Sequence, residues 1–302
     1  MTQGPQDVTA NVGAVVAAVL FGVSVVAVRV AVEDVDPLDL AVLRFGQGAV
    51  ILLLVLALRA PSQLRINLRD LPLLALLGAI FFSAFPFTFN TALRYTDASR
   101  GALVLATMPV WSMLLGRYLA QERLRPGQVA GVALTVAGVG LAATGDRAVA
   151  AGANALLGDA LMLVTALLGA LYGVLAQRAL IRYQPLTVTT YAMAIGTLLL
   201  LPAALPGGFV AESVLGPHLV GLLLFLGVFG GALAFFLWTA ALARLSPTRV
   251  AVYVNLNPMV AALLGILLLS EPTGPEFFAG FFAVVSGVYL VNVRPSLDRA
   301  QK

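Results

Sequence analysis

Long apolar runs, each of about twenty residues, make up most of the chain, and short clusters of proline, glycine and charged residues separate them. A membrane-spanning helix needs about 20 predominantly apolar residues, whereas the strands of membrane barrels show short alternating segments. The pattern therefore predicts an all-α polytopic membrane protein with ten transmembrane helices. The expected spans are roughly residues 10–32, 37–58, 71–94, 98–119, 126–144, 155–180, 186–204, 217–243, 247–269 and 275–293.

Composition agrees with this pattern. Hydrophobic residues make up 60% of the chain and charged residues 11%, compared with about 45–50% and about 25% in soluble domains. Most of the surface must therefore face lipid. Cysteine is absent, which excludes a disulfide framework and a thiolate metal site. We expect no metal and no cofactor, and we expect a small-molecule substrate and the lipid bilayer as partners.

The basic residues indicate an orientation in the membrane. A net charge of +4 could indicate nucleic-acid binding, but the basic residues lie singly or in threes between apolar runs. That distribution is typical of membrane topology, so we expect no nucleic-acid partner. If the N-terminus lies inside, 13 Lys and Arg residues fall inside and 4 outside. This bias predicts an inner (plasma) membrane protein with both termini in the cytoplasm. The first residues lack the basic segment of a signal peptide, so the first run is interpreted as a retained span.

The chain also repeats itself. When residues 92–141 are laid over 241–290 at a constant shift of 149, about 17 of the 50 positions are identical. The halves 10–144 and 155–293 would each hold five spans, an odd number, so the second half must enter the membrane from the opposite side. Inverted repeats of this kind are found in many secondary transporters, although a duplication can also merely enlarge a bundle. The matched positions include Pro109/Pro258, Gly116/Gly265, Glu122/Glu271, Pro126/Pro275, Gly131/Gly280 and Gly138/Gly287.

The repeated block carries a family resemblance. The segments ALRYTDASRGALVLATMPVWSMLLGRYLAQERL and ALARLSPTRVAVYVNLNPMVAALLGILLLSEP both resemble the second half of an EamA domain. PLDLAVLRF in the second span and GDALMLVTALLGALYGVLAQRAL in the sixth are similar to other parts of that domain. The resemblance covers about residues 10–293 and implies a ten-helix member of the drug/metabolite transporter superfamily. Among bacterial members, the chain is most similar to amino-acid exporters, in particular the YddG type that exports aromatic amino acids.

The resemblance leaves the substrate and the coupling open. The superfamily exports amino acids, other metabolites and toxic compounds, and it also includes importers and nucleotide-sugar carriers. Small dimeric relatives use a glutamate in the first span for proton and cation exchange, but the first span here has no carboxylate between residues 11 and 32. Coupling through another group and facilitated diffusion both remain open.

Aromatic and polar residues in the third span mark a candidate substrate site. FFSAFPFTFN corresponds to GGALAFFLWT in the repeat, so that Phe89 matches Trp238 and Asn90 matches Thr239. Aromatic side chains with polar neighbours suit a planar or apolar ligand. The alternatives are aromatic residues that pack or face lipid, and polar groups that tie helices together. The candidate substrate-binding residues are Ser24, Phe85, Phe89, Asn90, Thr107, Trp111, Tyr172, Trp238, Tyr253 and Asn257.

Two prolines and two asparagines interrupt the apolar pattern near the middle of the fourth and ninth spans. Pro109 and Pro258 cannot donate a hydrogen bond to the carbonyl four residues earlier, so both are predicted hinges. Asn257 shares a helix face with Tyr253, and we expect it to face the cavity. Asn255 points the other way in an α-helix and is expected to bond a neighbouring helix.

Arg44 lies about two turns, or about 10 Å, into the second span. It could contact a substrate carboxylate. The sequence favours instead a side chain that snorkels outward or pairs with Glu33, Asp34 or Asp36.

Spans five and ten carry glycines at four- and seven-residue spacing and few polar groups. Small residues permit close helix contact, so these helices are expected to brace the bundle or to meet a second subunit, which makes an oligomer an open alternative.

The sequence thus predicts a secondary transporter that exports amino acids, aromatic ones included, or related metabolites by alternating access at a midplane cavity. An exporter of drugs or organic cations, an intramembrane enzyme and a channel are the alternatives. We expect no enzyme, because the single histidine, His218, lies at a loop edge and no nucleophile–base pair is evident. A channel would show rings of charge, which the pattern lacks.

Overall fold

The computed structural model describes residues 5–95, 104–119, 121–142, 155–204, 216–260, 263–264 and 275–292. Helices and the turns between them account for these residues, and no strand occurs among them. The all-helical expectation is therefore confirmed for the described chain. Two residues matched between the halves, Gly265 and Glu271, lie outside the described residues.

A proline is the first or second residue of each α-helix described for the first half. Pro37 opens α2, where the Asp36 side chain accepts a hydrogen bond from the Leu38 amide. Proline suits the first helical turn because its missing N–H would have no partner there. The elements are α1 (Pro5–Asp34), α2 (Pro37–Arg59), the short turns η1 (Pro61–Leu64) and η2 (Leu68–Asp70), α3 (Leu71–Gly78), η3 (Ala79–Ala84), α4 (Phe85–Tyr95), α6 (Met108–Leu119) and α7 (Pro126–Ala142).

The second half follows the same order. Its elements are α8 (Ala155–Leu180), α9 (Pro185–Ala204), α10 (Pro217–Phe225), η6 (Leu226–Leu233), α11 (Ala234–Leu242), α12 (Pro247–Ala251), η7 (Val252–Leu256) and α14 (Pro275–Asn292). The segments η3 and η6 are π-helical and join their flanking α-helices without a break. They occupy corresponding places, because a shift of 149 carries η3 onto residues 228–233.

Six helical stretches of the described chain are long and apolar enough to cross a membrane, and two shorter apolar helices accompany them. Large apolar side chains such as Leu58, Ile181 and Phe282 are more than half exposed. Such a surface suits lipid rather than water. The six stretches are Asp7–Val32, Pro37–Arg59, Leu68–Tyr95, Leu156–Leu180, Pro185–Ala204 and Pro217–Leu242.

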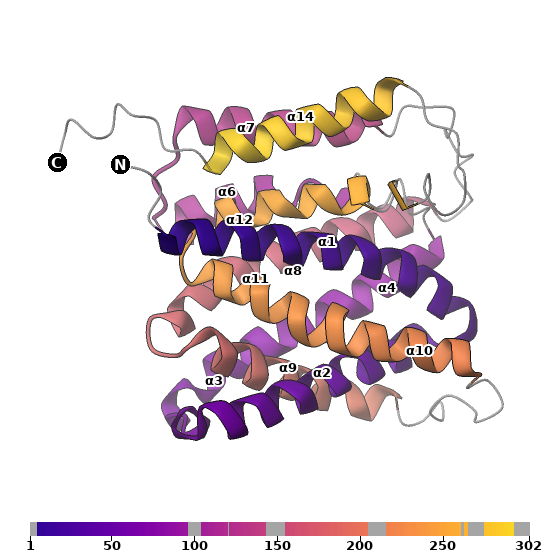
Figure 1. Ribbon diagram of the computed structural model, residues 1–302, viewed down its shortest axis with the longest axis vertical. Coiled ribbons are helices and arrows are strands. Elements are labelled where there is room, and N and C mark those ends of the chain that lie inside the picture. Colours follow the sequence, from indigo (N-terminus) through magenta and orange to yellow (C-terminus); the bar gives the residue numbers. More distant parts are fainter. Residues whose placement is uncertain are drawn as a thin grey trace.

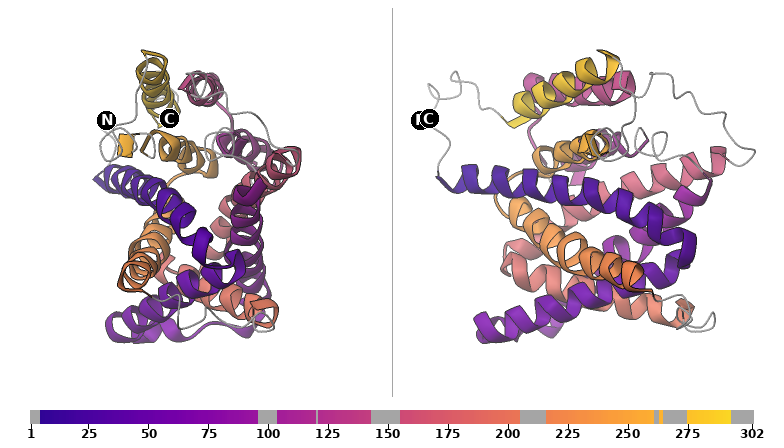
Figure 2. Two further views of the ribbon diagram at one scale, coloured as in Figure 1. Left: turned by 90° about the vertical axis from the view of Figure 1, so that its right-hand side faces the viewer. Right: turned by 45° about the vertical axis from the view of Figure 1, so that its right-hand side comes forward.

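The helices form an elongated bundle (Figure 1). The antiparallel pair α7 and α14 lies at one end, and α2 packs on α9 toward the other end (Figures 1 and 2). The first turn of α1 and the last turn of α14 lie on the same side of the bundle (Figure 1).

Contacts between helices of the two halves occur in corresponding pairs. In the middle of the bundle α4 packs on α8, and the corresponding α11 packs on α1. Likewise η3 packs on α9, and the corresponding η6 packs on α2. Each half therefore completes its packing with helices of the other half.

Glycines let α7 and α14 approach closely, as their spacing predicts. A Cβ atom on Gly131 would lie 2.8 Å from the Gly287 carbonyl oxygen, and one on Gly138 would lie 2.9 Å from that of Gly280. In the alignment of the two halves Gly131 matches Gly280 and Gly138 matches Gly287. Each glycine therefore contacts the residue that matches the other glycine of its own helix. These two helices brace one end of the bundle through backbone contact.

Replacing Gly287 by alanine tests this contact. The new Cβ would lie 2.6 Å from the Gly131 carbonyl oxygen and 2.5 Å from Thr135 Cγ2. We expect a lower melting temperature in detergent, with a loss of about 1–3 kcal/mol from overpacking. The matched control is Gly221→Ala, where a Cβ meets nothing within 4 Å. It should leave stability unchanged or raise it by up to about 1 kcal/mol through helix propensity. Equal melting temperatures for the two variants would contradict the close contact.

Candidate functional site

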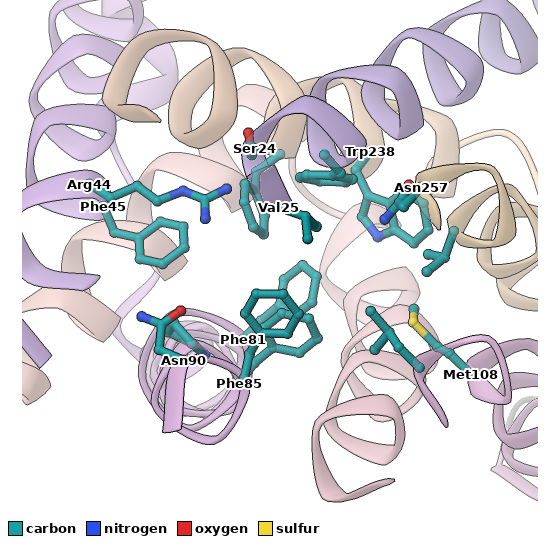
Figure 3. A pocket seen from close by; sticks show the side chains of 16 residues that line it. Ser24, Val25, Arg44, Phe45, Phe81, Phe85, Asn90, Met108, Trp238 and Asn257 are labelled. Carbon is teal, nitrogen blue, oxygen red and sulfur yellow. The ribbon is translucent and has the colours of Figure 1, made fainter. Parts of the chain in front are cut away.

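A cavity of about 70 Å³ lies in the middle of the bundle and is bounded by helices of both halves (Figure 3). Its walls come from α1, α2, η3, α4 and α6 of the first half and from α11 and residues 254–257 of the second half. Pockets for drug-sized ligands measure about 300–1,000 Å³, so a substrate of amino-acid size requires the side chains to move apart.

Six of the ten residues singled out from sequence line this cavity. They come from α1, α4, α11 and the segment after η7, and Figure 3 shows that the labelled members face one space. The six are Ser24, Phe85, Phe89, Asn90, Trp238 and Asn257.

The other four lie elsewhere. Tyr172 is fully buried behind the wall, stacked on Phe81 at 4.0 Å between ring centroids, with its hydroxyl 3.1 Å from Thr239 Oγ1. The Tyr253 hydroxyl donates to Asn11 Oδ1 at 2.8 Å and so joins η7 to α1.

Thr107 and Trp111 face each other as their spacing predicts, but they bond within their own segment. Trp111 Nε1 donates to Thr107 Oγ1 at 3.3 Å, and Thr107 Oγ1 donates to the Val104 carbonyl at 2.6 Å. Neither side chain lines the cavity.

Aromatic rings packed edge to face form the cavity wall. Phe235 lies 4.9 Å from Phe21, 5.3 Å from Phe45 and 5.2 Å from Phe81, measured between ring centroids. Such T-shaped pairs are favourable beyond the area they bury. Phe21, Phe45, Phe81 and Phe235 were not singled out from sequence, because phenylalanine in an apolar run looks the same whether it faces lipid or a cavity. Phe87, by contrast, is 43% exposed on the outer surface.

Arg44 corrects the sequence interpretation. Its side chain neither snorkels nor pairs with an acid: the residue is 9% exposed, lines the cavity, and Nη2 donates to the Gly230 carbonyl at 2.8 Å. Its guanidinium carbon lies 5.1 Å from the centroid of the Phe45 ring, a favourable cation–π contact. Asp36 instead pairs with Arg94 at 3.0 Å. Arg44 points inward because the Gly230 carbonyl and the Phe45 ring lie closer to it than the acids at the start of α2.

The π-helical segment η6 explains why the Gly230 carbonyl is available. In an α-helix the Ala234 N–H would donate to this carbonyl. Here it donates to the carbonyls of Phe229 and Gly231 instead. π-Helical turns of this kind are frequent at functional sites. A Cβ on Gly230 would lie 2.4 Å from Ser24 Oγ and 3.3 Å from Arg44 Nη2, so glycine is needed for these groups to converge.

The cavity is rich in hydrogen-bond donors. Arg44 Nε and Trp238 Nε1 are buried and have no hydrogen-bond partner in the described chain. The Asn90 amide nitrogen donates to the Pro37 carbonyl at 3.0 Å. The Asn257 amide, oriented to satisfy its neighbours, donates to the carbonyl of Ala18 at 2.9 Å. Among the lining residues that the structure describes there is no carboxylate, and the one formal charge, on Arg44, is positive.

The two prolines lie directly after interruptions of their helices. A turn at residues 106–107 precedes α6, whose second residue is Pro109, and the 3₁₀ segment η7 precedes Asn257 and Pro258. The Val254 carbonyl that Pro258 leaves without its α-helical donor accepts from the Asn257 backbone N–H. The hinge role of both prolines remains a prediction.

Asn255 differs from expectation. It is fully buried, and neither atom of its amide has a hydrogen-bond partner in the described chain, so the predicted tie to a neighbouring helix is wrong. Its segment is a 3₁₀ helix with three residues per turn, which points side chains differently from the α-helix assumed from sequence.

Comparison with known proteins decides the family. The profile of the EamA-like transporter family matches twice, over residues 8–144 and 156–293. The chain belongs to the EamA-like transporter family. Members of this family are transporters and not enzymes, and with its apolar helices the chain is a multi-pass membrane transporter.

Relatives of this EamA-family chain carry transporter names. A protein of Archaeoglobus fulgidus named "Uncharacterized transporter" is 32% identical, over 90% of this chain and 93% of its own length. A "Probable terminal-alkyne amino-acid exporter" of Streptantibioticus cattleyicolor is 30% identical, over 89% and 88%. A "Probable amino-acid metabolite efflux pump" of Salmonella typhimurium is 26% identical, over 92% of each chain. A solved crystal structure, 21% identical, shares the fold with a TM-score of 0.78 over 97% of this chain and 99% of its own.

The buried hydroxyl pair behind the cavity can be tested by a double-mutant cycle. Tyr172→Phe and Thr239→Val each remove one partner of the same hydrogen bond and leave the other buried without a partner. We expect each single variant to lose about 1 kcal/mol, and the double variant to be at least as stable as either single variant. Additive losses in thermal unfolding would show that the two hydroxyls do not interact.

Proposed function

We propose that this protein is a secondary transporter that exports amino acids, aromatic ones included, or related small metabolites across the inner membrane. The observation that carries the proposal is the central cavity, whose walls are aromatic and are drawn from both halves of the chain. The names of the relatives from Streptantibioticus cattleyicolor and Salmonella typhimurium support amino acids or their metabolites as the substrate class.

Alternating access is the mechanism we propose, with ten spans in two inverted five-helix repeats, residues 10–144 and 155–293. The repeated sequence and the exchange symmetry of the helix contacts support this arrangement. The start of α1 and the end of α14 on one side support an even number of crossings (Figure 1). The excess of basic residues on that side supports cytoplasmic termini. Rocking of one repeat against the other would expose the midplane cavity to each side in turn.

A polar contact between the halves on the proposed cytoplasmic side is a candidate closing contact. The Glu122 carboxylate, between α6 and α7, accepts hydrogen bonds from Ser246 Oγ at 2.6 Å and Thr248 Oγ1 at 3.0 Å. Both donors lie at the start of α12 in the second half. Hydrogen bonds to a charged group are worth about 1.5–3 kcal/mol each, enough to bias a two-state equilibrium.

Export of organic cations is the second candidate left by the sequence. Aromatic faces can bind an organic cation, but the lining residues that the structure describes also include an arginine and no carboxylate, and the arginine charge repels a cation. This charge favours the amino-acid proposal.

Transport can be tested with purified protein in liposomes. We expect counterflow of at least one apolar or aromatic amino acid, and Trp238→Ala should weaken it about tenfold or more because it removes a ring and a donor from the cavity wall. Val132→Ala, at a buried position on α7 away from the cavity, is the control and should alter stability rather than affinity. Lack of counterflow with every amino acid in a mixed panel would refute the substrate assignment.

The closing contact can be tested by labelling, because the chain has no native cysteine. In a Met108→Cys background the reporter lies in the cavity wall. Glu122→Gln should speed its reaction with an impermeant maleimide from the cytoplasmic side about tenfold, since the bonds to Ser246 and Thr248 weaken. Glu276→Gln, in the first turn of α14, is the matched control. If both variants label at the same rate, Glu122 does not hold the cytoplasmic side closed.

A further inference from the structure

Arg44 has a guanidinium edge free to bind a ligand. Its only hydrogen bond to the rest of the described chain uses one N–H of Nη2, which donates to the Gly230 carbonyl. Nε, Nη1 and the second N–H of Nη2 have no partner there, so one pair of parallel N–H groups remains for a ligand. An unpaired charge inside the membrane is costly, and such residues mark substrate or ion pathways. In the described chain no carboxylate forms an ion pair with Arg44.

Arg44 also breaks the symmetry of the two halves. When Asp36-Pro37 is laid over Gln184-Pro185, Arg44 corresponds to Ala192 in α9. Gly230, which accepts from Arg44, lies in the π-helical segment of the opposite half. The contact therefore joins the two halves at the cavity and has no counterpart across the repeat. A contact needed only for packing would have no reason to place an unmatched charge there.

The groups around Arg44 define the chemistry of its ligand. Trp238 Nε1, a second donor without a partner, lines the same cavity, and six of the other fourteen lining residues are phenylalanines. The fork of an arginine matches the two oxygens of a carboxylate, and aromatic walls suit an apolar body. An ammonium group finds no lining carboxylate to pair with.

We propose that Arg44 is the carboxylate-binding residue of this transporter and that its ligands are apolar monocarboxylates, recognised by the carboxylate and not by the amino group. This inference rests on the proposed function and deepens it. It extends the substrate class from amino acids to apolar carboxylic acids without an amine. It excludes amines without a carboxylate.

The experiment measures calorimetric affinity of the full chain in lipid nanodiscs for two series of three probes. The aromatic series is L-phenylalanine, 3-phenylpropanoate without the amine, and L-phenylalaninamide without the carboxylate. The aliphatic series is L-leucine, 4-methylpentanoate and L-leucinamide. In at least one series, we expect both carboxylates to bind about tenfold or more tightly than the amide, the size expected for hydrogen bonds to a charged group. An amide that binds as well as the acids would overturn the proposal without any variant.

Three variants locate the effect. Arg44→Gln should weaken both carboxylates about tenfold or more while the cationic amide binds equally or better. The carboxylate affinity of Arg44→Lys should lie between those of the native protein and Arg44→Gln, because an ammonium keeps the charge but loses the two-point fork. The control is Arg94→Gln, which removes an equal charge from a half-exposed pair with Asp36 near the same membrane face. Equal losses in Arg44→Gln and Arg94→Gln would overturn the proposal in favour of a general field effect.

Counterflow in liposomes with the same protein separates this inference from the proposed function. If amino acids exchange but neither series shows a preference for the carboxylate, the Arg44 assignment fails and the transport function stands. If no amino acid exchanges while the carboxylates without an amine bind through Arg44, the amino-acid assignment fails and the carboxylate site stands.

Discussion

Within a lipid bilayer every backbone N–H and carbonyl must find a partner inside the protein, and this constraint shapes the centre of the molecule. Within the spans, the segments that depart from α-helical bonding, η3, η6 and η7, lie at or beside the cavity, where side-chain or backbone donors supply the missing partners. The carbonyl of Gly230 loses the usual donor in η6 and accepts from Arg44 instead. Near Pro258 a 3₁₀ bond from Asn257 satisfies Val254. The irregular backbone and the polar side chains of the site therefore depend on each other for their hydrogen bonds.

Much of the fold could be read from the sequence, because membrane helices are marked by length and composition alone. The glycine spacing in α7 and α14 correctly predicted their close contact, because a residue without a Cβ lets another backbone come near. Ser24, Asn90 and Asn257 stand out as polar residues in apolar runs, and all three line the cavity.

Other parts of the site could not be predicted, for physical reasons. A ring such as Phe81 or Phe235 has the same hydropathy whether it meets lipid, a neighbour or a ligand, and only the three-dimensional packing separates these cases. The bond expected of Asn255 was misjudged: its amide is buried without a partner in the described chain, in a 3₁₀ segment where an α-helix was assumed. Arg44 was misjudged because helix-end acids are visible in the sequence, whereas a carbonyl released by a π-helical turn is not.

The two π-helical segments bear on how the two halves of the chain evolved. Each widens its helix by the equivalent of one inserted residue, and both lie at the same register of the two halves, η3 at Ala79–Ala84 and η6 at Leu226–Leu233. One insertion in a single ancestral half, copied when the gene doubled, accounts for both. Arginine at position 44 occurs in one half only, so the two copies differ at this position. Both halves therefore share the widened turn, whereas only one half supplies a charged side chain that bonds to a carbonyl within it.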